Sequence, residues 1–297
     1  MTAKTLYELH AACVKNIKDA PQFNWTVKFD CESRELRDLV MPDVEDEASI
    51  WRSESVPADF YFTHAEHYGD GVKHIIQELT DKPTSNRALY SLICQNKISN
   101  SGDRPIPSFM TLQCQISDET LYCTCYFRAL EVSRFFKINL EEIRQTLVEI
   151  SDAVPGFSKI SLTIFAFRAY VDMDRAPLKR PRLEVMPEYQ LVASVLDAAT
   201  QPVKNLDRML KELREAVTAV SPAKLISLRS ILSMTAPGIV IPKQLKDKLF
   251  LEELDLAIEA TRRLEQLRRK QSHGVQVEDA TKSYQSAIDR ARARLNV

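Results

Sequence analysis

Residues 107–139 read PSFMTLQCQISDETLYCTCYFRALEVSRFFKIN, and this stretch decides how the first half of the chain is organised. Apolar and polar residues alternate from Met110 to Ile116 and again from Leu121 to Phe127. Alternation with a period of two predicts half-buried strands. The polar run Ser117-Asp118-Glu119 predicts a turn between them. Two strands joined by a turn would place Gln113, Tyr126 and Arg128 on the non-core face.

The flanking segments add helices and strands to this pair. Helical spacing of apolar residues predicts helices over 3–19, 72–79 and 140–153, whereas apolar or alternating runs predict strands over 23–29, 88–94 and 160–171. No element is assigned to the acidic segment 32–58. The pattern predicts an α+β domain with a mixed sheet and flanking helices over residues 1–175.

Several residues of the stretch match the spacing of a known signature. The matching positions are Pro107-Ser108-Phe109, Gln113, Leu121, Cys123, Tyr126-Phe127-Arg128-Ala129, Glu131 and Asn139, with Tyr68-Gly69 and Lys82–Arg87 upstream. In this order and at these gaps the chain resembles the thymidylate synthase and dCMP hydroxymethylase superfamily over residues 60–175. The resemblance implies a thymidylate-synthase-like sheet and a nucleotide site.

The departures from that family concern its chemistry. Ser108 stands where the family has its cysteine nucleophile, Phe109 replaces a histidine, and Arg168-Ala169-Tyr170 replaces a late H-x-Y motif. A serine hydroxyl needs a general base to act as a nucleophile, whereas a thiol is partly ionised near neutral pH. We therefore expect no thymidylate synthase activity, no catalytic residue at Ser108 and no cofactor.

The resemblance assigns roles to six residues, Arg87, Gln113, Arg128, Glu131, Asn139 and Tyr170. It implies that Arg128 binds the phosphate of a pyrimidine nucleoside monophosphate. It also implies that Arg87 reaches the phosphate held by a second subunit, so the chain would be a homodimer formed through the sheet. Glu131 and Asn139 would orient the base, and Gln113 and Tyr170 would serve structure or contact the sugar.

A structural interpretation of the same residues stays open. Arg87 and Arg128 would then be ion-paired sheet residues, and the pocket would be filled by Phe109, Phe165 and Phe167. Asn139 precedes the predicted helix 140–153, where asparagine is a common N-cap.

Beyond residue 175 the composition changes. Residues 176–187 contain a basic, proline-rich run that predicts a linker. Its cations Lys179, Arg180 and Arg182 indicate either a solvated hinge or a contact with phosphate or nucleic acid. Residues 188–297 predict a helical domain, with helices over 189–199, 203–220, 222–234, 243–271 and 277–295. The last two would form an antiparallel hairpin that packs in the fold or binds a protein partner.

Composition excludes some classes of protein. The formal net charge of −1 argues against binding nucleic acid through bulk charge. No apolar run approaches the length of a membrane span, and we expect a cytoplasmic protein. The six cysteines form no CxxC pair, and His64, His67 and His74 favour solvated or hydrogen-bonded histidines over a metal site.

Three functions remain open. The first is a nucleotide-binding relative of thymidylate synthase without its activity, which has a regulatory or interaction role. The second is a pyrimidine-modifying transferase with a displaced nucleophile such as Cys94 or Cys114. The third is a structural subunit whose sheet dimerises and whose helices hold another protein.

Overall fold

The computed structural model describes residues 3–100, 105–171, 179–180, 185–187, 190–191, 194–195, 201–217, 220–233, 241–270 and 274–295. The chain divides into two compact units. The first, here the sheet unit, consists of Met1–Val56, Phe62–Ile98 and Ile106–Arg175. The second, the helical unit, consists of Pro57–Tyr61, Ser99–Pro105 and Ala176–Val297.

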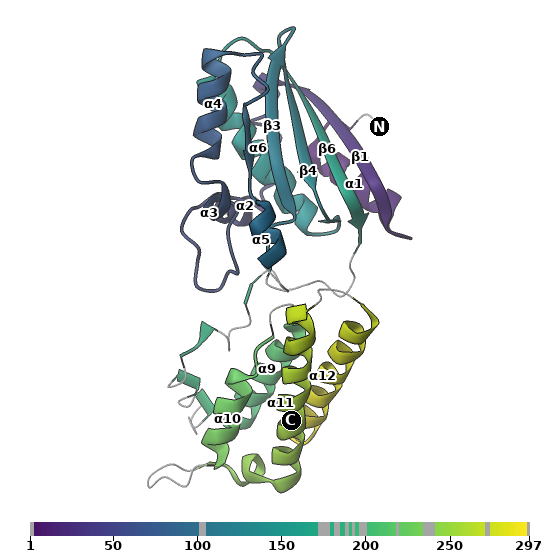
Figure 1. Cartoon of the computed structure of the whole chain (residues 1–297), viewed down its shortest axis with the longest axis vertical. Helices are drawn as coiled ribbons and strands as arrows, with labels where there is room; N and C mark the ends of the chain where they lie inside the picture. The colour runs from purple at the N-terminus through teal and green to yellow at the C-terminus, as the bar shows by residue number, and fades with distance from the viewer. Residues whose placement is uncertain are drawn as a thin grey trace. The chain divides into compact units, whose positions relative to one another are not determined.

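The sheet unit is built on a six-stranded mixed sheet (Figure 1). Its strands are β1 (Gln22–Glu32), β2 (Leu89–Ser91), β3 (Phe109–Ser117), β4 (Thr120–Phe127), β5 (Leu130–Glu131) and β6 (Lys159–Tyr170). The order is β1-β6-β4-β3-β2, and β5 pairs with the end of β6. The pairs β4–β6 and β5–β6 are parallel, and the pairs β1–β6, β3–β4 and β2–β3 are antiparallel. The predicted α+β class with a mixed sheet is confirmed.

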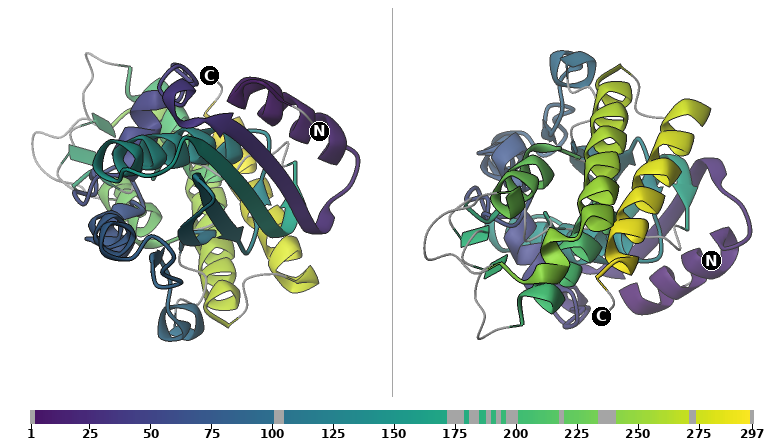
Figure 2. Two further views of the ribbon diagram at one scale, coloured as in Figure 1. Left: turned by 90° about the horizontal axis from the view of Figure 1, so that it is seen from above. Right: turned by 90° about the horizontal axis from the view of Figure 1, so that it is seen from below.

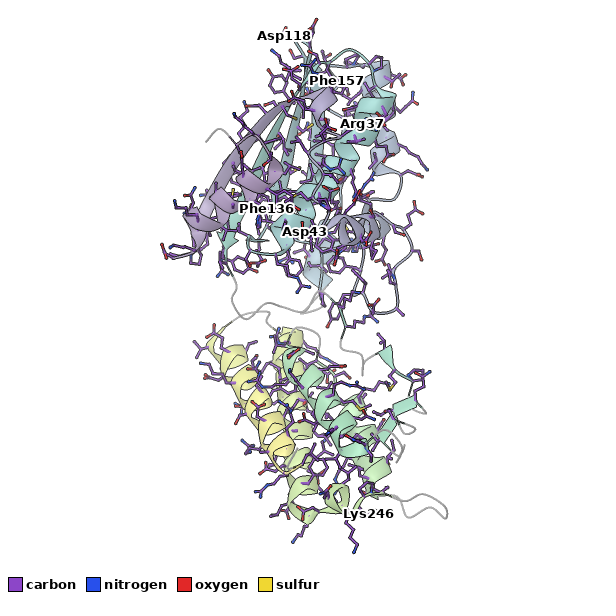
Figure 3. All side chains as sticks on the ribbon, turned by 180° about the vertical axis from the view of Figure 1, so that it is seen from behind. Arg37, Asp43, Asp118, Phe136, Phe157 and Lys246 are labelled. Carbon is purple, nitrogen blue, oxygen red and sulfur yellow. The ribbon has the colours of Figure 1, made fainter. Side chains whose placement is uncertain are left out.

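The two strands of the stretch 107–139 form a tight hairpin. Ser117 pairs with Thr120, and the two residues between them, Asp118 and Glu119, have φ angles of 48° and 57°. Two-residue turns with positive φ match the right-handed twist of antiparallel strands. Figure 3 shows Asp118 at this tip, with Phe157 close by at the same end of the sheet.

One face of the sheet carries the core. Its strand residues include Leu112, Cys114, Cys123, Cys125, Leu162 and Ile164. Helices α1 (Leu6–Ile17), α4 (Gly71–Asp81) and α6 (Phe135–Ala153) contribute their apolar faces to the same core, and α2 (Glu45–Trp51) packs against α6. The rings of Trp25 on β1 and Phe136 on α6 meet edge to face at 5.9 Å. These contacts place α6 across the core face of the sheet.

The opposite face of the sheet, called the open face below, is accessible in this chain. It carries Gln113 and Gln115 on β3, Tyr122, Thr124 and Tyr126 on β4, and Phe165 and Phe167 on β6. Tyr122 is 48% exposed and Phe167 is 50% exposed. Tyr126 and Phe165, partners in the β4–β6 register, stack with ring centroids 5.4 Å apart. The open face therefore combines aromatic surface with polar side chains.

The helical unit contains α9 (Pro202–Glu215), α10 (Ala223–Ser233), α11 (Lys248–Lys270) and α12 (Val275–Ala293). They enclose a second core that includes Leu206, Leu228, Leu254 and Tyr284. Figure 2 shows α11 and α12 side by side, which confirms the predicted helix pair. The pair starts later than predicted: Lys243–Lys246 form a 3-10 turn, and the Asp247 carboxylate accepts from Phe250 N–H at 3.0 Å, which caps α11. The predicted helix 189–199 lies mostly outside the described residues.

Two cations of the predicted linker are engaged with a distant loop. Phe60 forms an isolated antiparallel bridge with Lys179, and Lys179 Nζ lies 3.1 Å from Asp59. Arg180 N–H donates to Asp59 O at 2.7 Å, and its guanidinium lies over the Tyr61 ring. Lys179 and Arg180 are exposed, as expected for a solvated hinge, but they also contact this loop, while Arg182 lies outside the described residues. All of these residues group within the helical unit.

Candidate functional site

Three of the six predicted site residues, Arg128, Glu131 and Tyr170, lie at one end of the sheet together with Ser108. Arg128, just after β4, donates its backbone N–H to Ser108 O at 3.0 Å. Glu131 on β5 is the register partner of Tyr170 on β6. Because β4 and β6 are parallel, their carboxyl ends lie at the same edge of the sheet. The edge beside the start of β3 therefore brings together Ser108, Arg128, Glu131 and Tyr170.

The Arg128 guanidinium is fixed by backbone oxygens. Nε donates to Pro107 O at 3.3 Å and Nη2 donates to Ile106 O at 3.2 Å. Partial burial lowers the pKa of Arg128, and the nearby Tyr170 opposes that effect. Among the described residues no carboxylate forms an ion pair with Arg128. The prediction that Arg128 is an ion-paired sheet residue is therefore wrong, and its charge is available to an anion.

Glu131 caps a helix. Its Oε1 accepts from Ser133 N–H at 2.8 Å, and Oε2 accepts from Arg134 and Phe135 N–H at 2.8 and 3.0 Å. Burial alone would raise the pKa of Glu131, but the hydrogen bonds from Ser133 and these amides bring it below its usual value. A buried carboxylate at a helix N-terminus stabilises the free amide groups there. This cap starts α6 at Phe135, so the predicted start at Leu140 was wrong.

Asn139 consequently lies inside α6 and is not an N-cap. Its Nδ2 donates to Glu142 Oε2 at 3.5 Å, and the residue is buried. The side chain is directed at Glu142 within the core and does not share an exposed surface with Arg128. The structure therefore separates Asn139 from the four residues at the sheet edge.

Arg87 and Gln113 lie elsewhere on the sheet. Gln113 pairs with Leu89 and donates its Nε2–H to Asn86 O at 3.0 Å, which places it beside the exposed Arg87. Gln113 in β3 lies five residues after Ser108, which directly precedes that strand. Five residues of extended chain span about 17 Å. Within one chain, Arg87 and Gln113 thus form a second group, away from Arg128.

A buried polar cluster beneath the sheet was not predicted as a unit. His64 is 3% exposed and Glu142 is 1% exposed, and Nδ1 of His64 lies 2.8 Å from each carboxylate oxygen of Glu142. Backbone N–H of His64 donates to Trp51 O at 2.9 Å. His64 and Glu142 are 78 residues apart in the sequence, so a local sequence pattern cannot predict this pair. His64 is hydrogen-bonded, and the described residues include no group of three His, Cys, Asp or Glu side chains placed to hold a metal ion.

Aromatic rings enclose this cluster. The His64 ring centroid lies 4.7 Å from Trp51, 5.8 Å from Phe109 and 6.1 Å from Phe62. Burial and the Glu142 carboxylate raise the pKa values of Tyr68 and Tyr90, so both phenols stay protonated. Phe109 lies in the core, which agrees with the structural interpretation in which Phe109, Phe165 and Phe167 fill the pocket. Phe165 and Phe167 lie on the open face, and for them that interpretation is wrong.

The sequence matches no protein-family model, and it has no match among curated proteins. The likeness to thymidylate synthase therefore rests on the motif positions alone. Among the helices within the described ranges, none combines the length and apolar character needed to cross a membrane.

Proposed function

We propose that the sheet unit binds a pyrimidine nucleoside monophosphate without thymidylate synthase activity, and that the protein has a regulatory or interaction role. The observation that carries the proposal is the charge of Arg128, which no carboxylate of the described residues neutralises. Its Nε and Nη2 are held by carbonyl oxygens, which fixes the plane of the guanidinium beside Ser108 and Tyr170. A partly buried guanidinium fixed in this way suits a phosphate dianion, since charge-assisted bonds to a planar fork are strong and directional.

The same edge of the sheet offers little for catalysis. Within the described part of the chain no histidine is hydrogen-bonded to Ser108, and the Ser108 backbone oxygen accepts from Arg128 N–H. The ring of the buried His64 contacts Phe109 at the start of β3, but its Nδ1 is hydrogen-bonded to Glu142 and not to Ser108. A hydroxyl without a positioned base is a weak nucleophile. This arrangement supports the proposal of binding without turnover.

The proposal includes a homodimer formed through the open face. Exposed aromatic side chains on an accessible sheet face are typical of interaction surfaces. Arg87 and Gln113 lie at one side of this sheet, away from Arg128 of the same chain. In a symmetric dimer Arg87 would serve the partner's nucleotide, as the family resemblance implies.

Thermal stability tests nucleotide binding. With dUMP, dCMP or UMP at about a hundredfold excess over Kd, we expect stabilisation of about 2.7 kcal/mol. For a unit of this size that is a rise in Tm of about 5–10 °C. Arg128→Met keeps the apolar stem and removes the charge, so the rise should fall below about 2 °C. The readout is tryptophan fluorescence, because both tryptophans of the chain, Trp25 and Trp51, lie in the sheet unit.

Arg37→Met is the matched control. Arg37 forms an exposed ion pair with Asp152 and lies away from the sheet edge, as Figure 3 shows, so this variant should keep the full nucleotide response. The corresponding nucleosides, which lack the phosphate, should give no rise. Equal shifts in wild type and Arg128→Met would contradict the role proposed for Arg128. No shift with any monophosphate would contradict nucleotide binding and favour the structural subunit.

A pyrimidine-modifying transferase is the second candidate, and the position of Cys94 favours it. Leu92 N–H donates to Met110 O at 2.9 Å, which continues the antiparallel register of β2 and β3. Cys94 follows two residues later, just before α5 (Gln95–Asn100), so it lies near the start of β3. Cys94 is exposed, whereas Cys114 is buried with its Sγ 3.5 Å from Cys123 Sγ. Cys114 is therefore unsuited to attack a substrate.

Alkylation separates these thiols. Iodoacetamide near neutral pH should label Cys94 first in the native protein, since attack requires an accessible thiolate. Burial raises the pKa of Cys13 to about 12 and that of Cys31 to about 11, and it raises the pKa of Cys123 well above its usual value, so these thiols should react far more slowly. Intact mass spectrometry would follow the labelling, and all six cysteines should react in denaturant. Fast labelling of Cys114 or Cys123 would show that the sheet core is open.

A further inference from the structure

The seam between α11 and α12 is hollowed on its solvent side. A hollow of about 790 Å³ lies there, and its lining includes Leu256, Glu259, Arg262, Arg263, Lys282 and Arg290. The floor is formed by the small residues Ala260 and Ala287, which allow a close approach of another backbone. The two helices run side by side (Figure 2), and the lining runs from Leu256 to Gln266 on α11 and from Lys282 to Arg290 on α12.

Two neighbouring hollows continue this surface. One of about 670 Å³ shares Leu256, Glu259 and Arg262 and extends to Ile226 on α10. Another of about 460 Å³ shares Lys282, Ser286 and Arg290 and extends to Arg214 on α9. We call the three together the hairpin groove. It crosses one face of the helical unit from α10 to α9.

The centre of the hairpin groove carries excess positive charge. At its margins Arg229 is paired with Asp255 at 2.9 Å, Arg214 with Asp289 at 2.7 Å, and Arg290 with Glu253 at 2.9 Å. The central cations Arg262, Arg263 and Lys282 have no ion pair with any residue in the described part of the chain. Glu259 is the one carboxylate lining the central hollow. The complementary ligand is therefore acidic.

The groove also has apolar contacts to offer. Leu256, which lines two of the hollows, is 48% exposed, and Ile226 is 38% exposed. An amphipathic helix laid into a groove buries its apolar face and brings its charged flank against the rim. Ridges of a third helix fit the groove between two packed helices.

The observations favour a protein helix over nucleic acid. Affinity for nucleic acid grows with the number of phosphates that free Lys and Arg side chains neutralise. The hairpin groove has three unpaired central cations, and the carboxylates Glu252, Asp255, Glu259 and Asp289 line it as well. Exposed leucine and isoleucine add nothing to phosphate contacts but fit an apolar helix face.

We propose that the hairpin groove binds an acidic amphipathic helix of a partner protein, with Leu256 under the apolar face of that helix and Arg262, Arg263 and Lys282 against its carboxylates. This specifies the partner class of the interaction role proposed above. The test of this proposal needs no nucleotide, so its outcome does not depend on whether the sheet unit binds a nucleotide.

Fluorescence anisotropy with the full chain tests the proposal. The probe is a labelled synthetic helix of about 18 residues, close to the length of α12, with leucine on one face and glutamate on the other. We expect binding to wild type at low salt and weakening by about tenfold or more in R262E/K282E, because charge reversal adds repulsion to the lost attraction. Leu256→Asp should weaken binding to a similar degree, and raised salt should weaken it in wild type.

Lys248→Glu is the matched charge reversal. Lys248 is 89% exposed at the start of α11 and lies outside the lining of the hairpin groove, so this variant should bind the probe as wild type does. Circular dichroism melting would show that each variant is folded. Equal binding by wild type and R262E/K282E, or no binding by wild type, overturns the proposal. Tighter binding of an oligonucleotide of about 20 nucleotides, lost in R262E/K282E, overturns it in favour of nucleic acid.

Discussion

Glu142→Ala is expected to destabilise the sheet unit by about 3–5 kcal/mol, because removing one partner of a buried hydrogen-bonded pair leaves the other without compensation. Both oxygens of Glu142 lie 2.8 Å from His64 Nδ1, and Asn139 donates to the same carboxylate. At this size the expected fall in Tm is about 6–20 °C. Tryptophan fluorescence reports it directly, since the Trp51 ring lies 4.7 Å from that of His64.

Glu149 on the same helix provides a control, because it also has a charged side chain with a partner but is not buried. Glu149 is half exposed and forms an ion pair with Arg52, so Glu149→Ala should cost no more than about 1 kcal/mol. Combining Glu142→Met with His64→Leu should recover much of the loss, because two apolar groups leave no buried charge. If Glu142→Ala and Glu149→Ala cost the same, the His64–Glu142 pair contributes little to stability.

Tyr122→Asp together with Phe167→Asp is expected to convert a dimer into a monomer of 33.9 kDa. These side chains are 48% and 50% exposed on the open face, and burying two carboxylates there would carry a large desolvation cost. Sedimentation velocity measures the change. Because Arg87 would serve the partner's nucleotide, the monomer should also lose much of the thermal response to nucleotide.

Leu249→Asp provides the comparison for this experiment. Leu249 is similarly exposed but lies in the helical unit, so the variant should remain a dimer. A wild-type monomer would refute the dimer proposal, while the Arg128→Met experiment would still decide nucleotide binding. Loss of the dimer with full retention of the nucleotide response would show that the site is complete within one chain.

The order of secondary structure was largely readable along the chain. Alternation over Met110–Phe127 predicted the hairpin, and the spacing of Leu6, Leu9, Cys13 and Ile17 predicted α1 with its buried face. These features depend on neighbours within a few residues, which the linear pattern records. The start of α6 was missed because a side chain four residues upstream, Glu131, supplies the cap.

For the candidate site, the sequence pattern predicted which residues are present but not which contacts they make. The sequence alone identified Ser108 at the position where the thymidylate synthase signature has a cysteine, the cations Arg87 and Arg128, and the helical character of the last hundred residues. Only the tertiary structure decided that Arg128 is held by carbonyl oxygens, that Asn139 points to Glu142, and that Asp59 and Phe60 hold Lys179. Each of these depends on which distant segments come into contact, and residue spacing along one element does not encode that.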